Sequence, residues 1–251
     1  MITTIGILFI GWLGAALVNY LADVLPFARR FIKPCCLYCN EVQKPINYFL
    51  WPRRCSACGR RRSMRTWIVE IILMIVSLWL WDSGAGNYGY IWGWVLWLYF
   101  AVVAVIDLEH RLILHPISWT GAALGLGLGF WQHGILDTLL GGAAGYGAMF
   151  ALYLLGDLFA RWMARRRGEE LDEVALGFGD VNLMGVIGLI LGWPGIVAGL
   201  LLGIIIGGTG SFLYLLGMLL FRRYKVFTAI PYGPFLITAA LLLLFFKDIF
   251  I

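Results

Sequence analysis

Long apolar runs, separated by short polar segments, dominate the chain. A helix needs about 20 mostly apolar residues to cross a hydrocarbon core of roughly 30 Å. Eight runs are candidates for that role, and the sixth is short and rich in glycine. We therefore expect an all-α, polytopic membrane helix bundle, with spans at 3–25, 66–82, 89–107, 116–132, 137–160, 180–192, 194–221 and 228–246.

The composition supports a membrane protein. Of the 251 residues, 61% are hydrophobic and only 13% are charged, which excludes an ordinary soluble globular domain. The first run looks superficially like a signal peptide. However, no basic segment precedes it and no small-residue cleavage site ends it cleanly, so we expect this span to be retained.

The basic residues predict the orientation of the chain. All lysines and arginines except Lys247 lie in alternate connections, within Arg29–Arg65, at Arg111, within Arg161–Arg167 and within Arg222–Lys225. By the positive-inside rule these connections face the cytoplasm, and both chain ends lie outside. The net charge of +5 then reflects loops beside an anionic leaflet, and it requires no nucleic-acid partner.

All five cysteines lie in one connection, residues 26–65. Two Cys-x-x-Cys pairs, formed by Cys36 with Cys39 and by Cys55 with Cys58, have the spacing with which four thiolates surround one Zn²⁺. Disulfides are the alternative, but a cytoplasmic loop is in a reducing compartment. Cys35 is left over, although it could replace Cys36 with a poorer spacing. We expect a closed, structural zinc site in this cytoplasmic loop.

Ionisable side chains inside a membrane span are costly and so are functional candidates. Asp157 lies four residues before Arg161, which favours an interfacial ion pair. Asp107 ends the third span and Asp180 begins the sixth, so the predicted topology brings both to the cytoplasmic end of the bundle. Two acids in contact can share one proton, and this pairing is the chemistry of aspartyl proteases.

The glycines beside Asp180 fit the same interpretation. Gly177 and Gly179 have no side chain, so the backbone can leave helical geometry there and a substrate strand can approach. The alternative is that Asp180 is only the N-cap of the sixth span. Two other classes of protein stay open: an ion-coupled transporter with buried acids, and a non-catalytic membrane scaffold that uses its zinc loop.

Several of these motifs resemble the type IV prepilin peptidases, which are GxGD intramembrane aspartyl proteases. Gly177-Phe178-Gly179-Asp180 matches the GxGD motif, and Asp107 matches the first catalytic aspartate. The cysteine pairs, the stretch "VEIILMI" with Glu70 and the stretch "IPYGPFL" are similar to further family features.

The resemblance implies a site and a substrate. Asp107 and Asp180 would be the catalytic pair, with Gly177, Phe178 and Gly179 as active-site backbone. The substrate would be a prepilin or pseudopilin of a type IV pilus or protein secretion system. Its basic leader would be cleaved at the cytoplasmic boundary of the bacterial inner membrane.

Many family members also methylate the new N-terminus with S-adenosylmethionine. Here the corresponding stretch is "GAALVNYLADVLP", in which Val24 occupies the usual arginine position. Valine cannot replace an arginine that fixes a carboxylate, which argues against methyltransferase activity, although Asn19 and Glu70 remain. Asn182 replaces the family's usual lysine, and His115 is expected to be interfacial.

The expected organisation has three parts: a first membrane helix, the zinc loop with its degenerate methyltransferase region, and a transmembrane peptidase bundle. The boundaries are 1–25, 26–65 and 66–251. The oligomeric state is left open.

Overall fold

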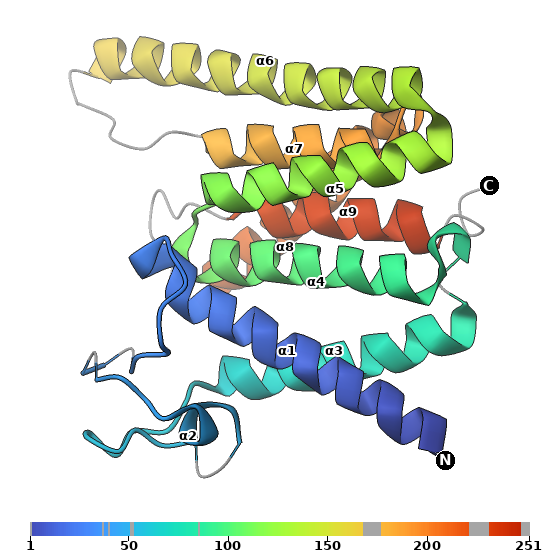
Figure 1. Ribbon diagram of the computed structural model, residues 1–251. Coiled ribbons are helices and arrows are strands. Elements are labelled where there is room, and N and C mark those ends of the chain that lie inside the picture. Colours follow the sequence, from blue (N-terminus) through green and yellow to red (C-terminus); the bar gives the residue numbers. More distant parts are fainter. Residues whose placement is uncertain are drawn as a thin grey trace. The chain divides into compact units, whose positions relative to one another are not determined.

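The computed structural model describes most of the chain, and its described residues are helical apart from loops and two isolated β-bridges. The described ranges are 2–36, 38–39, 41–50, 53–84, 86–167, 177–220 and 231–246. Eight main helices correspond to the eight predicted spans, which confirms the all-α bundle (Figure 1). Their bounds are α1 Ile2–Ala28, α3 Met64–Ser83, α4 Gly89–His110, α5 His115–His133, α6 Ile135–Arg167, α7 Phe178–Leu191, α8 Gly195–Leu220 and α9 Gly233–Phe245, with the short α2 at Pro45–Phe49 and the 3₁₀ turn η1 at Gly86–Tyr88.

Five of the described helices are long and apolar enough to cross a membrane, so the chain is a multi-pass membrane protein. These are Ile2–Ala28, Met64–Ser83, Gly86–His110, Ile135–Met163 and Gly195–Met218. Helix α7 has only 14 residues and is about 21 Å long, which is shorter than the hydrocarbon core.

Most helix boundaries lie within three residues of the prediction, and two differ by five residues or more. Helix α6 continues to Arg167 instead of ending at 160, because its basic last turns still suit a helix in water. Helix α9 begins at Gly233 instead of 228, with Pro234 in its first turn, where proline costs no hydrogen bond. Residues 228–230 lie outside the described part of the chain.

The chain divides into two compact units, residues 1–106 and 107–251, and the expected three-part division remains a prediction. In the first unit, α1 packs on α3 through small residues. A Cβ added to Gly11 would lie 2.8 Å from the Cα of Met74, and one added to Gly14 would lie 2.5 Å from the Trp94 ring. Close packing of this kind is how membrane helices associate.

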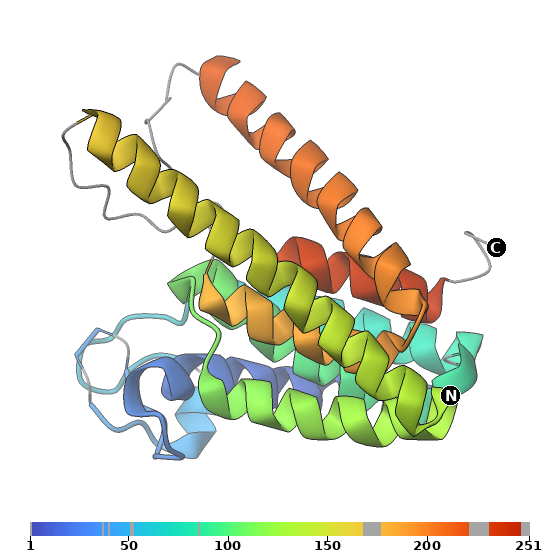
Figure 2. The ribbon, with the colours of Figure 1, turned by 90° about the horizontal axis from the view of Figure 1, so that it is seen from above.

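In the second unit, α7 is the central helix, and it packs against α5, α6, α8 and α9 (Figure 1). Figure 2 shows that α6 crosses α7 obliquely. Glycines permit this contact: a Cβ on Gly141 would lie 2.4 Å from the Gly188 carbonyl oxygen, and one on Gly188 would lie 2.2 Å from the Gly141 carbonyl oxygen. The backbones of α6 and α7 are therefore in direct contact.

Two glycines on α5 provide a matched test of this packing. A Cβ on Gly129 would lie 2.2 Å from the Leu189 carbonyl oxygen, whereas Gly127 has nothing within 4 Å of that position. We expect Gly129→Ala to destabilise the protein by about 1–3 kcal/mol, because backbone must move. Gly127→Ala should leave the stability unchanged or slightly higher. Thermal unfolding in detergent measures both, and equal melting temperatures would contradict the packing described.

Candidate functional site

The two carboxylates singled out in the sequence belong to the same unit. Asp107 lies in the last turn of α4 and Asp180 in the first turn of α7, and both are buried, at 5% and 8% exposure. The carboxyl groups are close enough for the charge on Asp107 to act on Asp180. The structure thus brings together two acids that are 73 positions apart in a chain of 251.

The start of α9 closes over Asp107. A Cβ added to Gly233 would lie only 2.5 Å from Asp107 Oδ2, so a side chain at this position would displace the carboxylate. Asp107 Oδ2 is buried and has no hydrogen-bond partner among the described residues. Sequence reasoning noted the Tyr-Gly-Pro-Phe stretch but did not assign Gly233 to the site. Gly233 comes directly before Pro234 at the start of a helix, and this position was the feature of the sequence that could have indicated its role.

Tyr232, the N-cap of α9, is also part of this site. The charge of Asp180 acts on its phenol, and the hydroxyl donates a hydrogen bond of 3.4 Å to the Gly203 carbonyl. Tyr232 therefore lies at the edge of the acid pair and is held there by α8.

Asp180 is not the N-cap of α7, so that alternative is wrong. Gly177 occupies the N-cap with extended backbone, Phe178 begins the helix, and Asp180 is its third residue. Gly179 is helical as well, which corrects the expectation of a non-helical backbone there. It permits close packing instead, since a Cβ on Gly179 would lie 2.8 Å from Cβ of Ile113.

Helix ends give the two acids different environments. Asp180 lies in the first turn of α7, where the helix dipole favours an anion. Asp107 lies in the last turn of α4, where the dipole disfavours an anion. Arg111, four residues later, partly offsets this effect through its charge. The arrangement can therefore keep one carboxylate ionised and the other protonated.

Asp157 serves as an internal comparison for these acids. It forms an ion pair of 2.8 Å with Arg161, four residues later on α6, as the sequence predicted. The side chain of Asp157 is 31% exposed, whereas Asp107 and Asp180 are buried. The contact with Arg161 is therefore a partly exposed ion pair of an ordinary kind.

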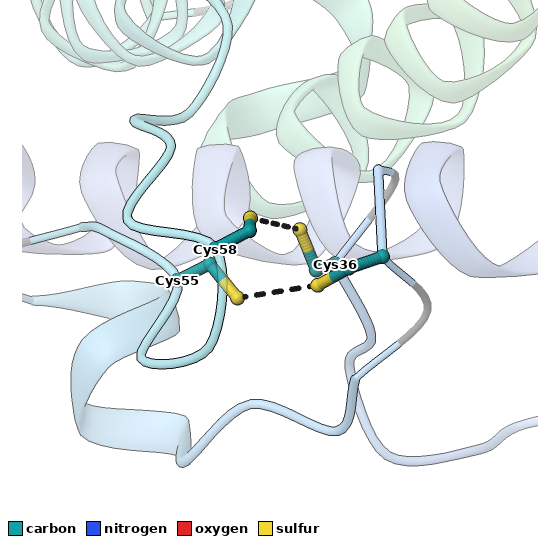
Figure 3. Close-up of side chains that lie close together, drawn as sticks. Cys36, Cys55 and Cys58 are labelled. Carbon is teal, nitrogen blue, oxygen red and sulfur yellow. Dashed lines mark hydrogen bonds between the residues drawn. The ribbon is translucent and has the colours of Figure 1, made fainter.

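The four cysteines of the two Cys-x-x-Cys pairs gather in one place (Figure 3). Their sulfur atoms all lie within 4.8 Å of one another, with 3.7 Å between Cys36 and Cys58 and 3.5 Å between Cys39 and Cys55. Four sulfurs that each lie about 2.3 Å from a tetrahedral Zn²⁺ are about 3.8 Å apart. The cluster could therefore hold a metal ion such as zinc.

Local backbone structure brings the cysteines of each pair close together. The bridges Cys35 to Val42 and Arg54 to Arg61 fold each pair into a tight turn. Backbone amides of Cys58 and Ala57 lower the pKa of the Cys55 thiol to about 7, which favours the thiolate that a metal needs. Cys35 is outside the cluster, and its thiol donates to the Lys33 carbonyl at 3.3 Å.

The residues that suggested a methyltransferase are occupied by contacts within the first unit. Glu70 forms a buried ion pair of 2.8 Å with Arg53, whose guanidinium also lies 4.4 Å from the centre of the Trp67 ring. Asn19 donates from Nδ2 to the Thr66 carbonyl at 3.3 Å. Arg53 was missed by sequence reasoning, because it comes from the cysteine loop and not from the motif.

A second buried carboxylate, Asp23, joins α1 to the cysteine loop. It accepts a hydrogen bond of 2.5 Å from the Tyr48 hydroxyl, pairs with Arg62 at 2.6 Å, and pairs with Arg65. A cavity of about 50 Å³ lies beside this cluster. Both buried acids of the unit are therefore neutralised by arginines.

Comparisons with known proteins agree with the motifs. The model of the type IV leader peptidase family matches residues 94–212. The chain is 28% identical over 236 residues to the prepilin leader peptidase/N-methyltransferase of Aeromonas hydrophila, covering 90% of this chain and 76% of that protein. It is 30% identical over 230 residues to the protein of the same name from Legionella pneumophila, covering 85% and 72%. No solved structure matches significantly.

Proposed function

The chain belongs to the type IV leader peptidase family, and on that premise we propose that it is an aspartyl endopeptidase of type IV prepilins or pseudopilins. It would remove the basic leader that precedes the apolar helix of these precursors. One observation carries the proposal: two buried carboxyl groups, from the end of one helix and the start of another, lie close together with Gly233 against one of them.

The different helix ends suggest a role for each acid. Asp180 takes a proton from water, whose oxygen attacks the carbonyl carbon, while Asp107 gives its proton to the carbonyl oxygen. The tetrahedral product then collapses. The C–N bond breaks, the leaving amine takes the proton from Asp180, and a hydroxyl proton of the tetrahedral product returns to Asp107. Both acids end in their starting states.

The charge pattern supports a location for this reaction. With the basic connections in the cytoplasm of a bacterium, both termini lie outside the inner membrane and the cysteine loop lies inside. Asp107 and Asp180 then face the cytoplasmic boundary. A basic leader is held at the same boundary, because its charges do not cross the membrane.

The acid pair is tested by Asp107→Asn and Asp180→Asn. We expect either change to reduce prepilin cleavage by at least about 100-fold, because each removes a proton-transfer group. Asp157→Asn is the matched control and should cleave normally, since its interfacial pair contributes little. The measurement is the mobility shift of a purified prepilin on leader removal.

Each outcome discriminates between the classes of protein. Cleavage that survives in either Asp107→Asn or Asp180→Asn would overturn the acid pair. A wild-type protein that cleaves no prepilin would instead favour the ion-coupled transporter or the membrane scaffold.

We also propose that Cys36, Cys39, Cys55 and Cys58 hold one structural Zn²⁺. The sulfur positions suit a closed tetrahedral site, which leaves no position for a catalytic water. When bound, the ion would cross-link the two turns of a loop that has few large aliphatic side chains. Its binding free energy would therefore contribute to the folding of the loop.

The zinc site has a matched control within the same loop. Cys58→Ser should lose most of the bound metal, because three thiolates bind zinc far more weakly than four. Cys35→Ser should keep one ion per chain, since its sulfur lies outside the cluster. Elemental analysis of the purified proteins measures the difference. Equal metal contents in the two variants would exclude the proposed ligands.

Glu70 and Asp23 are not free to bind S-adenosylmethionine in this arrangement. Both are already paired with arginines, and the cavity of about 50 Å³ beside Asp23 is far smaller than the roughly 300–1,000 Å³ of cofactor sites. A larger cavity of this unit, about 730 Å³ along α1 and α2, is lined mainly by apolar side chains and has no charged group among its described lining residues to hold the cofactor. We therefore propose that the chain cleaves prepilins without methylating them, in contrast to what the names of its relatives say of those proteins.

Mass spectrometry of the cleaved product tests this proposal. With S-adenosylmethionine present, we expect the new N-terminus to keep a free amine and to gain no methyl group. A purified relative that is named as an N-methyltransferase, treated identically, controls for the assay. A product heavier by one methyl group would contradict the proposal while leaving the peptidase assignment intact.

A further inference from the structure

The second unit has a groove that the proposed acid chemistry does not use. It has a volume of about 330 Å³ and lies between α5, α6 and α7. Its lining is mostly apolar, with polar groups from His115, Ser118 and Asn182. His115 and Asn182 are two of the residues that the sequence left without a role.

We propose that this groove binds the apolar transmembrane helix of the substrate, next to the scissile bond. The inference rests on the proposed peptidase function and names the surface that recognises the membrane part of the precursor. The apolar helix, and not the basic leader, is the part of the substrate that would lie in the groove.

The groove is continuous with the Gly-Phe-Gly-Asp motif. On α7 its lining follows one helical face, with Phe178, Asn182, Gly185 and Leu189 at spacings of four, three and four residues. Asp180 lies two residues before Asn182, so the two side chains point about 200° apart around the helix axis. The groove and the acids are therefore on opposite faces of α7, and both begin at its first turn.

The proposal requires the substrate to pass from one face of α7 to the other around the first turn of this helix. Gly177 is exposed there and carries no side chain. An α-helix is about 10 Å wide, and an extended chain spans about 3.3 Å per residue, so roughly three residues suffice for the passage. The docked helix would then begin about three residues after the cleaved bond.

The chemistry of the lining selects a peptide helix over a lipid. No lysine, arginine or carboxylate is among the described residues that line the groove, so a lipid phosphate has no counter-charge there. Ala122, Gly142 and Gly185 are small, which lets a helix backbone approach closely. The neutral polar groups of His115 and Asn182 can bond to peptide groups at the frayed end of such a helix.

An aromatic stack connects the groove to the motif. Tyr146 stacks on Phe150 at 6.0 Å, Phe150 stacks on Tyr153 at 6.3 Å, and Tyr153 meets the Phe178 ring edge-on at 5.8 Å. Phe178 is the variable residue of the Gly-Phe-Gly-Asp motif, and the residue is 42% exposed. The stack therefore forms an apolar wall that runs from the groove to the Gly-Phe-Gly-Asp motif.

Two neighbouring alanines on α5 make a matched test. Ala122 lines the groove, whereas Ala123 is exposed and does not line it. We expect Ala122→Phe to raise the KM for a full-length prepilin by about tenfold, which corresponds to about 1.4 kcal/mol. Cleavage of a peptide that ends three residues after the scissile bond should be unchanged. Ala123→Phe should behave as wild type with both substrates.

Photo-crosslinking gives a readout that does not depend on cleavage. Trp119 lines the groove, and a benzophenone side chain replaces it in the Asp180→Asn variant. This variant is then mixed with a full-length prepilin and irradiated. We expect an adduct to the apolar helix of the prepilin, and none from the same group at position 123. An adduct to lipid alone, or normal KM in Ala122→Phe, would overturn the groove. A wild-type enzyme that cleaves neither substrate would refute the peptidase, and the crosslink would still decide whether the helix binds.

Discussion

Direct backbone contact between α6 and α7 is the constraint on which the second unit depends. Gly141 and Gly188 approach so closely that either Cβ would collide with a carbonyl oxygen. This contact, with Gly129 against Leu189, buries α7 among four other helices. Because α7 is short and begins at Phe178, its first turn lies inside the unit, and Asp180 is buried beside Asp107.

The buried acids of the described ranges fall into two groups. Asp23 and Glu70 are each paired with arginine, which compensates for their removal from water. Asp107 and Asp180 form no ion pair among the described residues, and they lie close enough for the charge on one to act on the other. An uncompensated pair of this kind is costly to keep, so a fold retains it where the acids perform chemistry.

Much of this arrangement could be predicted from the sequence, because it depends on local pattern. Apolar run lengths predicted eight helices, and the cysteine spacing predicted which four sulfurs would meet. The long-range partners could not be predicted. Arg53 reaches Glu70 across a loop, and Gly233 meets Asp107 from a distant helix. Helical periodicity defines the face on which a residue lies, but it does not identify the segment that packs against that face.

The residues linked to the two activities of the family lie in different units of the chain. Both acids proposed for proteolysis belong to residues 107–251, whereas Asn19, Glu70 and the cysteine cluster belong to residues 1–106. Arg53 pairs with Glu70 inside the first unit, so the burial of this carboxylate is compensated within the chain itself. A lineage can therefore lose one activity through substitutions in the first unit while selection continues to preserve the other, and the unit that has lost its chemistry persists as a structural part.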